Sequence, residues 1–275
     1  MRWLHSSALI ATIIVAWGIS THPIALAHEE GRGAQLKQAV LLYQHGMYRE
    51  AIPFAKEALK AAEHDFGPDH PKVTTSLSYL ALLYRALEEY DQAEPLYQRA
   101  LAIDEKALGP DHTNVAINLD NLAEVYRAQG RHAEAEPISK RALEIFEKAL
   151  GPDDLHVAIN LTNLAEIYRA QGRHNEAEPL SKRALAIYEK ALGPDHLRVA
   201  SSLNKLALLH LDQEEYSQAE PLFRRAMAIY EKALGPNHPT VAKSLESMAE
   251  VYTKTGRQEE AKKLLERAKK IQAGR

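Results

Sequence analysis

The chain has 275 residues, 45% hydrophobic and 26% charged, an ordinary composition for a globular protein with a sizeable core. Its formal net charge of −3 provides no basic excess for binding a phosphate backbone, so nucleic acid is excluded as an expected partner. Because the sequence contains no cysteine, disulfides, thiol catalysis and zinc–cysteine sites are excluded as well.

Residues 1–27 have the pattern of a secretory signal peptide. Arg2 precedes a 12-residue apolar run at residues 8–19, and small residues lead up to His28. The run is too short for a membrane span, which needs about 20 residues. We expect cleavage after Ala27, no membrane span afterwards, and a periplasmic or secreted protein. An uncleaved N-terminal anchor is the alternative.

Residues 28–66 predict a degenerate helix pair. The stretch from residue 48 to 67 has the pattern of a good amphipathic helix, whereas the helix expected before it, around residues 34–45, matches poorly.

The rest of the chain is a sequence repeat. The copies begin with "FGPDH", "LGPDH", "LGPDD", "LGPDH" and "LGPNH", and successive copies start 42 residues apart without an insertion or deletion. A period of this size predicts stacked units, each of which buries its apolar face against its neighbours. The five expected repeats are 67–108, 109–150, 151–192, 193–234 and 235–275.

Each repeat predicts two helices, as the copy at residues 109–150 illustrates. Apolar residues recur from Val115 to Tyr126 at the spacing of an amphipathic helix, and Gly130 is expected to end that helix with a positive φ. The second helix is expected to stop at Gly151. Pro137 lies early in it, where the first four N–H groups have no helical partner, and so is expected to mark its start. The prolines in the corresponding place are Pro53, Pro95, Pro179 and Pro221.

The pattern Leu-x-x-Leu-Ala-x-x-Tyr…Gly…Ala-x-x-x-x-x-x-Ala resembles the tetratricopeptide repeat. Together with "NLAEVYRAQGRHAEAEP" and "LGPDH", the 42-residue period is most similar to the kinesin-light-chain subtype. The resemblance implies an all-α fold, a right-handed α-solenoid of stacked antiparallel helix pairs with closely packed alanines. Departures from the pattern are Glu88 and Glu214 in the glycine place and His210 in the tyrosine place. The signature falls on Leu119, Leu122, Ala123, Tyr126, Gly130, Ala135 and Ala142.

The dipeptide Asp111–His112 follows a Gly-Pro bend and raises the question of an active site. The third copy has Asp154 in place of the histidine, and the fifth has Asn237 in place of the aspartate. Asparagine cannot act as a carboxylate base, but it caps a helix about as well as aspartate does. We therefore interpret the dipeptide as a helix joint. Asp111 or its immediate neighbour should accept a hydrogen bond from the first turn of the next helix.

Metal and catalytic sites are not expected. Four of the 13 histidines recur once per repeat, which places them on the order of 10 Å apart, whereas zinc ligands lie about 2.0–2.1 Å from the ion. The sequence has no G-x-S-x-G, H-E-x-x-H or P-loop motif. We expect no cofactor, no metal, no catalytic residue and no enzymatic activity.

The expected function is that of a non-enzymatic scaffold, which binds an extended peptide or a partner protein in the concave groove of an exported repeat array. The alternative is a self-associating structural or assembly element of the cell envelope. Lys269 replaces the apolar residue of the earlier repeats, so the C-terminal end is not expected to stack head to tail. The oligomeric state is otherwise open.

The resemblance implies that first helices line the groove and that the residue before the central Leu-Ala contacts a bound peptide. Asparagine suits this place because its amide both donates to and accepts from a peptide backbone. We expect Asn121 and Asn163 to bind the backbone, with Arg127 and Arg169 meeting acidic groups. The alternative is that the charged residues pair within the groove, as Glu124 with Arg127. The candidate residues are Tyr79, Arg85, Asn121, Glu124, Arg127, Asn163, Glu166, Arg169 and Lys205, with Ser247 in the last copy.

Overall fold

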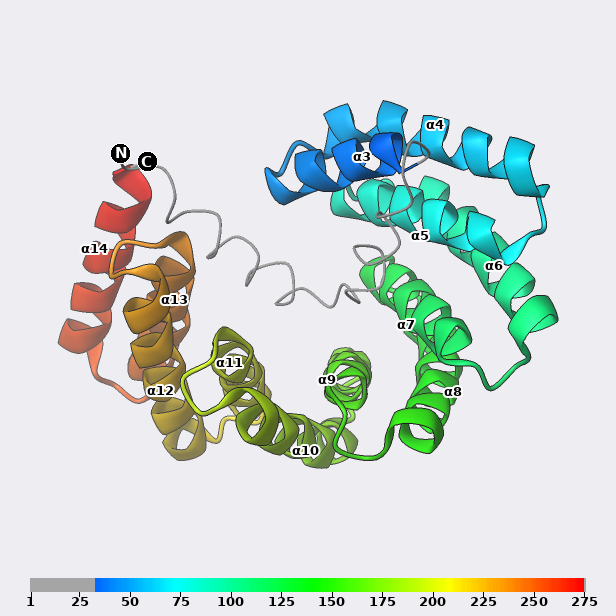
Figure 1. The fold of residues 1–275 in the computed structure, drawn as a ribbon. Helices are drawn as coiled ribbons and strands as arrows, with labels where there is room; N and C mark the ends of the chain where they lie inside the picture. Colours follow the sequence, from blue (N-terminus) through cyan, green and yellow to red (C-terminus); the bar gives the residue numbers. More distant parts are fainter. Residues whose placement is uncertain (1–32, 275) are drawn as a thin grey trace. The chain divides into compact units, whose positions relative to one another are not determined.

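The computed structural model describes residues 33–274, and the signal peptide expected at residues 1–27 lies outside them. Over the described part the chain forms twelve α-helices and no strand, which confirms the all-α prediction (Figure 1). None of these helices combines the length and the apolar character needed to cross a membrane.

The chain divides into two compact units at residues 152 and 153. Unit 1 comprises α3 (Ala34–Gln44), α4 (Tyr48–Phe66), α5 (Pro71–Ala86), α6 (Tyr90–Leu108), α7 (Thr113–Ala128) and α8 (His132–Leu150). Unit 2 comprises α9 (Leu155–Ala170), α10 (His174–Leu192), α11 (Leu197–Asp212), α12 (Tyr216–Leu234), α13 (Pro239–Lys254) and α14 (Gln258–Ala273).

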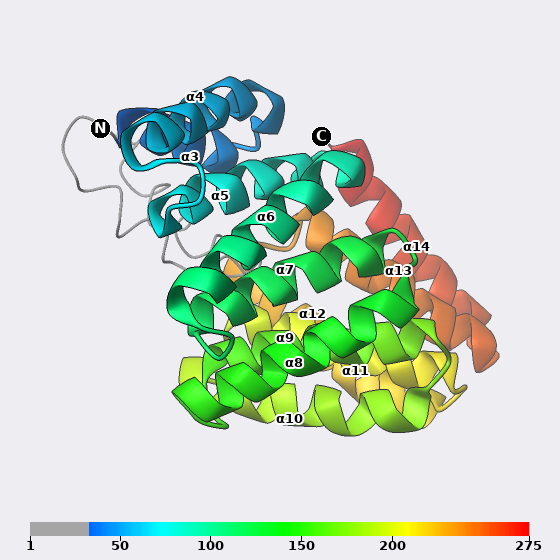
Figure 2. The ribbon, with the colours of Figure 1, turned by 90° about the vertical axis from the view of Figure 1, so that its right-hand side faces the viewer.

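Within each unit, consecutive helices pack against one another in chain order. The helix pairs are α3/α4, α5/α6 and α7/α8 in unit 1, and α9/α10, α11/α12 and α13/α14 in unit 2. Inside a unit, a second helix also packs against the first helix of the next pair: α4 against α5 and α6 against α7 in unit 1, and α10 against α11 and α12 against α13 in unit 2 (Figure 2). This is the stacking of a tetratricopeptide α-solenoid, and it explains why one pair alone does not bury its apolar residues.

The alanines of the signature are buried in the core. Ala123, Ala135, Ala142 and Ala177 are all 0% exposed. Larger side chains complete the close packing of the core. The largest fully buried ones are Tyr97, Phe146, Phe223, Leu77 and Leu83.

The first helices of the full repeats are 16 residues long, and the second helices before α14 are 19 residues long. Gly130 has φ 75° and ends the turn after α7 as predicted. At the corresponding place in two other repeats Glu88 and Glu214 both have φ 60°, a conformation that costs a non-glycine residue on the order of 1 kcal/mol.

The prolines of the second helices do not lie where the sequence suggested. Pro137 is the sixth residue of α8, beyond the four N–H groups that lack helical partners. The expectation that it marks the helix start was therefore wrong. The proline is tolerated because both Pro137 and Ala133, whose carbonyl loses its partner, are exposed to water.

The Asp-His dipeptide is a helix joint, and the neighbour of the aspartate is the cap. Nδ1 of His112 accepts a hydrogen bond from the Asn114 N–H at 3.1 Å. In the third repeat Asp154 takes this place and accepts from the His156 N–H at 2.8 Å. Asp111 instead pairs with Lys148 Nζ at 2.5 Å, and this bond lowers the pKa of its carboxyl. The prediction of a capping neighbour is confirmed.

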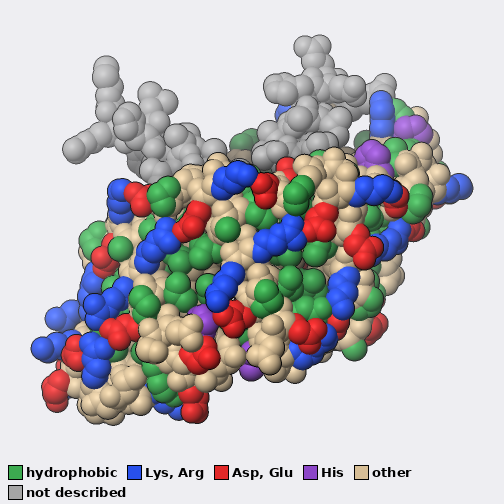
Figure 3. All heavy atoms as spheres, turned by 90° about the horizontal axis from the view of Figure 1, so that it is seen from below, with side chains coloured by type: hydrophobic (Ala, Val, Ile, Leu, Met, Phe, Trp, Pro, Cys, Tyr) green, Lys and Arg blue, Asp and Glu red, His purple; other side chains and the backbone are tan. Residues whose placement is uncertain are grey.

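Ion pairs between successive second helices reinforce the stack. Arg141 of α8 pairs with Glu105 of α6 at 2.6 Å and donates to the Pro110 carbonyl at 3.2 Å. In unit 2 the same two contacts are made by Arg225 with Glu189 and the Pro194 carbonyl. Acidic and basic side chains are accordingly mixed on the face that Figure 3 shows, without a large field of one sign. These pairs are solvated, so each contributes little alone.

Candidate functional site

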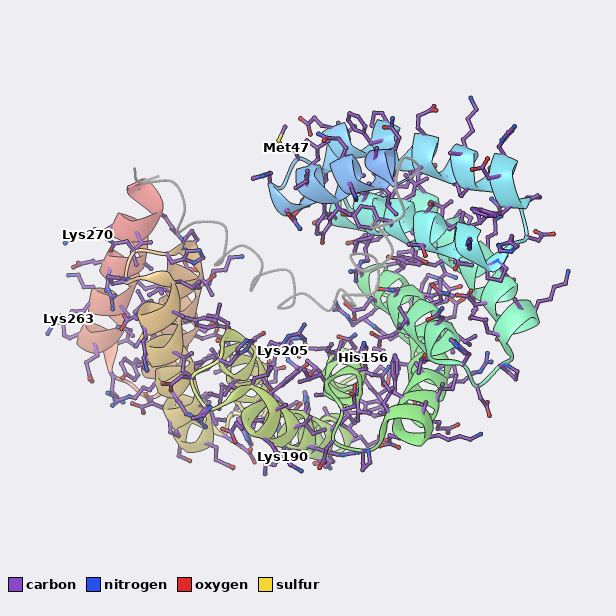
Figure 4. All side chains as sticks on the ribbon, in the orientation of Figure 1. Met47, His156, Lys190, Lys205, Lys263 and Lys270 are labelled. Atoms are coloured by element: carbon purple, nitrogen blue, oxygen red, sulfur yellow. The ribbon has the colours of Figure 1, made fainter. Side chains whose placement is uncertain are left out.

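The candidate residues lie on the first helices of the two units. In unit 1 they lie on α5 and α7, which we call the first-helix surface of unit 1. In unit 2 they lie on α9, α11 and α13, the first-helix surface of unit 2. Within unit 2, Lys205 of α11 and Lys190 of α10 extend from opposite sides (Figure 4). First and second helices therefore present different surfaces because they belong to opposite layers of the unit.

Asn121 is half-buried on α7, on the residue before the Leu122–Ala123 pair. Among the described residues its side chain forms no hydrogen bond, so both ends of the amide remain available. The side chain has this exposure because Leu122 and Ala123 turn inward, at 3% and 0% exposed.

The charged residues next to Asn121 pair with one another. Arg127 binds Glu124 with both ends of its guanidinium, from Nε to Oε1 at 2.8 Å and from Nη2 to Oε2 at 3.1 Å. Arg85 of α5 approaches the same carboxylate at 3.9 Å. This ion pairing is the alternative that the sequence left open, and it links α5 to α7.

Arg85 keeps its charge in a crowded environment. Burial opposes that charge, but the neighbouring Tyr97, Glu124 and Tyr43 outweigh it, so the pKa of Arg85 is raised. Within residues 33–274 the buried hydroxyl of Tyr97 has no hydrogen-bond partner, and burial raises the pKa of Tyr97 to about 12.

Tyr79 does not form part of an open surface, contrary to the expectation for a groove residue. It is only 4% exposed. Its ring meets Tyr43 of α3 edge-on, with 6.0 Å between the centroids, and burial raises the pKa of Tyr79. The poorly patterned N-terminal pair covers it, and the sequence offered no sign of this because α3 matches the repeat so weakly.

In unit 2 the corresponding charges also form ion pairs. Arg169 of α9 pairs with Glu166 at 3.4 Å and, through Nε, with Asp212 of α11 at 2.6 Å. Sequence reasoning missed Asp212. A signal was present, since Asp212 stands where the other repeats have Ala86, Ala128 and Ala170.

The asparagine row continues in unit 2 with changed chemistry. Asn163 and Lys205 are both half-buried. Lys205 forms no ion pair with any residue of the described chain, so its ammonium group is available to a partner. Ser247 of α13 donates to the Lys243 carbonyl at 3.3 Å, a bond within its own helix. The surface therefore offers amide, ammonium and hydroxyl groups in successive repeats.

The first-helix surfaces contain no cluster of metal ligands among the described residues. Within residues 33–274 no three His, Asp or Glu side chains are grouped so that they would hold a metal ion. The capping histidines, such as His70 and His112, each use Nδ1 to end a different first helix. The arrangement is suited to recognition by hydrogen bonds and charge.

Comparison with known families agrees with this architecture. The family model of the tetratricopeptide repeat matches residues 33–106, 74–148, 114–190, 156–232 and 198–273, which together span most of the chain. A comparison with curated proteins gave no match.

Several solved structures are similar to the chain. BtubC (BKLC) from P. vanneervenii is 25% identical, with a TM-score of 0.68 over 88% of this chain and 92% of that one. A Podosopora anserina protein with nearly identical kinesin-light-chain TPR-like repeats is 29% identical, with a TM-score of 0.64 over 74% of this chain and 97% of that one. PilW, a type IV pilus biogenesis factor, is 19% identical with a TM-score of 0.63 over 86% and 91% of the two chains, and shares the fold.

The repeat length and the similarity to kinesin-light-chain-like arrays agree with the subtype that the sequence indicated. On the strength of the overlapping family matches and the stacked helix pairs, the chain belongs to the tetratricopeptide repeat family.

Proposed function

We propose that this chain is a non-enzymatic scaffold that binds an extended peptide, or an extended segment of a partner protein, on its first-helix surfaces after export. Tetratricopeptide repeat proteins are in general non-catalytic scaffolds for protein–protein interaction. The observation that supports the proposal best is Asn121, a half-buried amide with no hydrogen bond of its own among the described residues.

An amide at this position suits backbone recognition. A peptide backbone offers one donor and one acceptor per residue, and an asparagine side chain can satisfy both without selecting a side chain. Because Asn121 is half-buried, its groups have already lost part of their hydration. A hydrogen bond formed there is worth about 0.5–1.5 kcal/mol net.

The ion pairs change what the arginines contribute. Arg127 and Arg169 already bind carboxylates, so an acidic group on the partner has to compete with Glu124 in one case and with Glu166 and Asp212 in the other. Lys205 has no such competitor among the described residues. We therefore assign the acidic contact first to Lys205 and treat the arginines as secondary contacts.

The proposal is tested with the double variant Asn121→Ala and Asn163→Ala. Crosslinking in the native periplasm first identifies the partner, and the affinity is then measured with the purified pair. We expect binding to weaken at least tenfold, or ~1.4 kcal/mol, with unchanged helical content and melting temperature.

The matched control is Gln92→Ala with Asn175→Ala, which removes two exposed amides from second helices. It should leave the affinity unchanged. A folded Asn121/Asn163 variant that binds the same partner as tightly as the wild type would move the binding site away from this surface.

The second candidate function, self-association, is favoured by the N-terminal helix pair. Leu41 of α3 is 50% exposed, whereas Leu83 and Val125 at the same position of the next two repeats are 0% exposed. Met47, in the turn after α3, is 42% exposed (Figure 4). At the position equivalent to Leu41, Val251 of α13 is buried in a cluster with residues of α11 and α12, the preceding pair. An exposed apolar side chain at this position is suited to a further packing contact.

Sedimentation velocity distinguishes self-association through α3 from a protein that stays monomeric. If the N-terminal pairs associate, the sedimentation coefficient should rise with concentration for the wild type and stay constant for Leu41→Glu. A wild-type protein that stays monomeric at high micromolar concentration would contradict self-association through α3.

A further inference from the structure

The carboxyl group of Asp104 on α6 is buried in the core of unit 1. The residue is 2% exposed. The equivalent residues of the later repeats are aromatic and equally buried: Phe146, Tyr188 and Tyr230, at 2%, 4% and 8% exposed. An ionised carboxylate at such a position is costly unless every oxygen is well hydrogen-bonded.

Asp104 is the end of a hydrogen-bond chain that crosses three helices. Ser78 of α5 donates to the Asn118 carbonyl oxygen on α7 at 2.9 Å. The Asn118 amide nitrogen then donates to Oδ2 of Asp104 at 2.8 Å. This accounts for both polar ends of the Asn118 side chain and for one of the two oxygens of Asp104.

The other oxygen, Oδ1, is buried and receives no hydrogen bond from the residues that the structure describes. The hydroxyl of Thr74 on α5 also lies beside this carboxyl group, but it donates to the Pro71 carbonyl at 2.8 Å. A hydroxyl has one proton and can accept at the same time. Thr74 can therefore serve two partners at once only if Asp104 is the donor to it.

We propose that Asp104 is a proton-dependent latch: in the folded chain its carboxyl group takes up a proton from solvent on Oδ1 and donates it to the Thr74 hydroxyl oxygen, which completes the hydrogen-bond chain joining α5, α6 and α7. In the neutral form every donor of the cluster has an acceptor. In the ionised form Oδ1 is a buried charge without a donor.

The electrostatic surroundings of Asp104 also favour its protonated form. Burial raises the pKa of Asp104 and outweighs the opposing effects of the neighbouring Thr74 and Asn118 side chains and of charge on His112. The groups acting on Asp104 are thus the neutral Thr74 of α5, the neutral Asn118 of α7 and the titratable His112 that caps α7. A positive charge on His112 opposes protonation of Asp104.

The sign of the pH dependence follows from the raised pKa. Below about pH 4, the ordinary range of an aspartate, the folded and unfolded chains both carry the proton, and the stabilisation is fully present. Between that pH and the raised pKa only the folded chain keeps it. Stability is lost over this interval as the pH rises, and the unfolding equilibrium constant increases by up to about tenfold per pH unit.

The latch has a consequence for the first-helix surface of unit 1. Ser78, at the outer end of the hydrogen-bond chain, is half-buried on α5, and α7 carries Asn121. Protonation therefore tightens the two helices that present this surface, so a partner held there is bound more firmly in acid. This last step rests on the proposed function, whereas the latch itself does not.

The test compares the full-length wild type with Asp104→Asn across pH 4.5 to 8. The asparagine amide donates to Thr74 and its oxygen accepts from Asn118, so this variant reproduces the neutral carboxyl group. We measure hydrogen-exchange protection factors of α6 and α7, which correct for the pH dependence of intrinsic exchange. The wild type should lose protection as the pH rises, and Asp104→Asn should keep it.

The matched control is Asp111→Asn, which neutralises an exposed aspartate of the same unit. It should retain the wild-type loss of protection as the pH rises. Asp104→Phe, which copies the Phe146 position, should also abolish the pH dependence. If Asp104→Phe does not fold, the comparison of Asp104→Asn with the wild type still tests whether Asp104 causes the pH dependence.

Two results would overturn the latch. One is an Asp104→Asn variant that loses protection with rising pH as steeply as the wild type does. The other is an infrared spectrum of isotope-labelled aspartate in which no buried carboxyl group is protonated at pH 5. Both readouts are independent of partner binding, so a failed binding experiment leaves them intact.

Discussion

His196 caps α11 by accepting a hydrogen bond from the Arg198 N–H at 3.1 Å, and Asp154 does the same for α9 with a carboxylate oxygen. The two side chains are interchangeable here because the cap requires an acceptor two atoms beyond the Cβ, in reach of the second N–H of the helix. They differ in how they respond to acid. A protonated imidazole has a donor at Nδ1, whereas an aspartate stays ionised near pH 5.

The cap on α11 should therefore weaken in acid. Burial, and then the positive charge of Arg198, lower the pKa of His196. A lowered pKa means that the stabilisation is present above about pH 6.5 and is lost as the pH falls through the folded-state value. We predict similar melting temperatures for wild type and His196→Asp at pH 8 and a higher one for His196→Asp at pH 5. Identical melting curves at pH 5 would show that the Nδ1 bond contributes nothing.

A single small residue also limits the packing of α10. Ala177 is 0% exposed, and a leucine there would need space that the close contact does not have. We predict that Ala177→Leu lowers the free energy of unfolding by ~1–3 kcal/mol, measured by urea denaturation. The control is Ala186→Leu at an exposed position of the same helix, expected to change stability by less than about 0.5 kcal/mol. Equal effects of the two substitutions would place Ala177 outside a packed crossing.

At the scale of whole elements, the turn between a first and a second helix is held by one arginine. Arg131 stacks on Tyr126 with 4.0 Å to the ring centroid and pairs with Glu134 of its own helix and Glu94 of α6. The first and fourth repeats have Glu89 and Glu215 in place of this arginine. In the fourth repeat His210 contacts Glu215 at 2.7 Å, and Glu214, like Glu88 in the first, adopts a positive φ.

The last helix, α14, ends the stack with a face of mixed character. Ala261, Ala268 and Ile271 are buried. Leu265 is 40% exposed. It occupies the position of Phe223, which is buried in a cluster with residues of α13, the first helix of the next pair. Among the described residues, no helix packs on α14 in this way.

Charge is expected to prevent further stacking on α14. Lys269 replaces the Met227 of α12, and Lys262 replaces Glu220, which binds Arg257 of the next pair in the inner array. Lys263 and Lys270 extend outward from the same helix (Figure 4). We predict no head-to-tail growth beyond a dimer in sedimentation velocity at rising concentration. Filaments that disappear in Lys269→Glu would contradict this prediction.

For the whole molecule, the unit of construction is the 42-residue repeat, and each repeat is stable only on its neighbours. Both units contain the same stack of first and second helices. Because the energy of such an array resides in nearest-neighbour contacts, a core change in α10 should loosen unit 2 first. Hydrogen exchange on Ala177→Leu reports this directly.

The proposed export also applies to the whole chain. We predict that the intact mass of the protein from its native host corresponds to a chain that begins at His28. Replacing Ala25 and Ala27 by arginine should block cleavage, because signal peptidases require small residues at these places. Recovery of the wild-type protein with Met1 still in place would favour the uncleaved anchor.

The sequence by itself determined the helix pairs, their 42-residue period and the family, because those depend on local features that repeat five times. Apolar spacing, the glycine after Tyr126 and the Gly-Pro bend each act within a few residues along the chain. Repetition also allowed the Asp-His dipeptide to be interpreted. Because Asp154 replaces the histidine in one copy and Asn237 replaces the aspartate in another, the sequence favoured a helix joint over a catalytic pair.

Only the tertiary structure decided which side chains meet across helices. The burial of Tyr79 under Tyr43 and the pairing of Arg169 with Asp212 both depend on residues brought together by packing. The same holds for Asp104. The sequence shows only that an aspartate stands at the position that Phe146 has in the next repeat. That Oδ1 lacks a donor among the described residues follows from how α5, α6 and α7 pack. Hydrogen bonds act over about 3 Å, a distance that the order of residues does not specify.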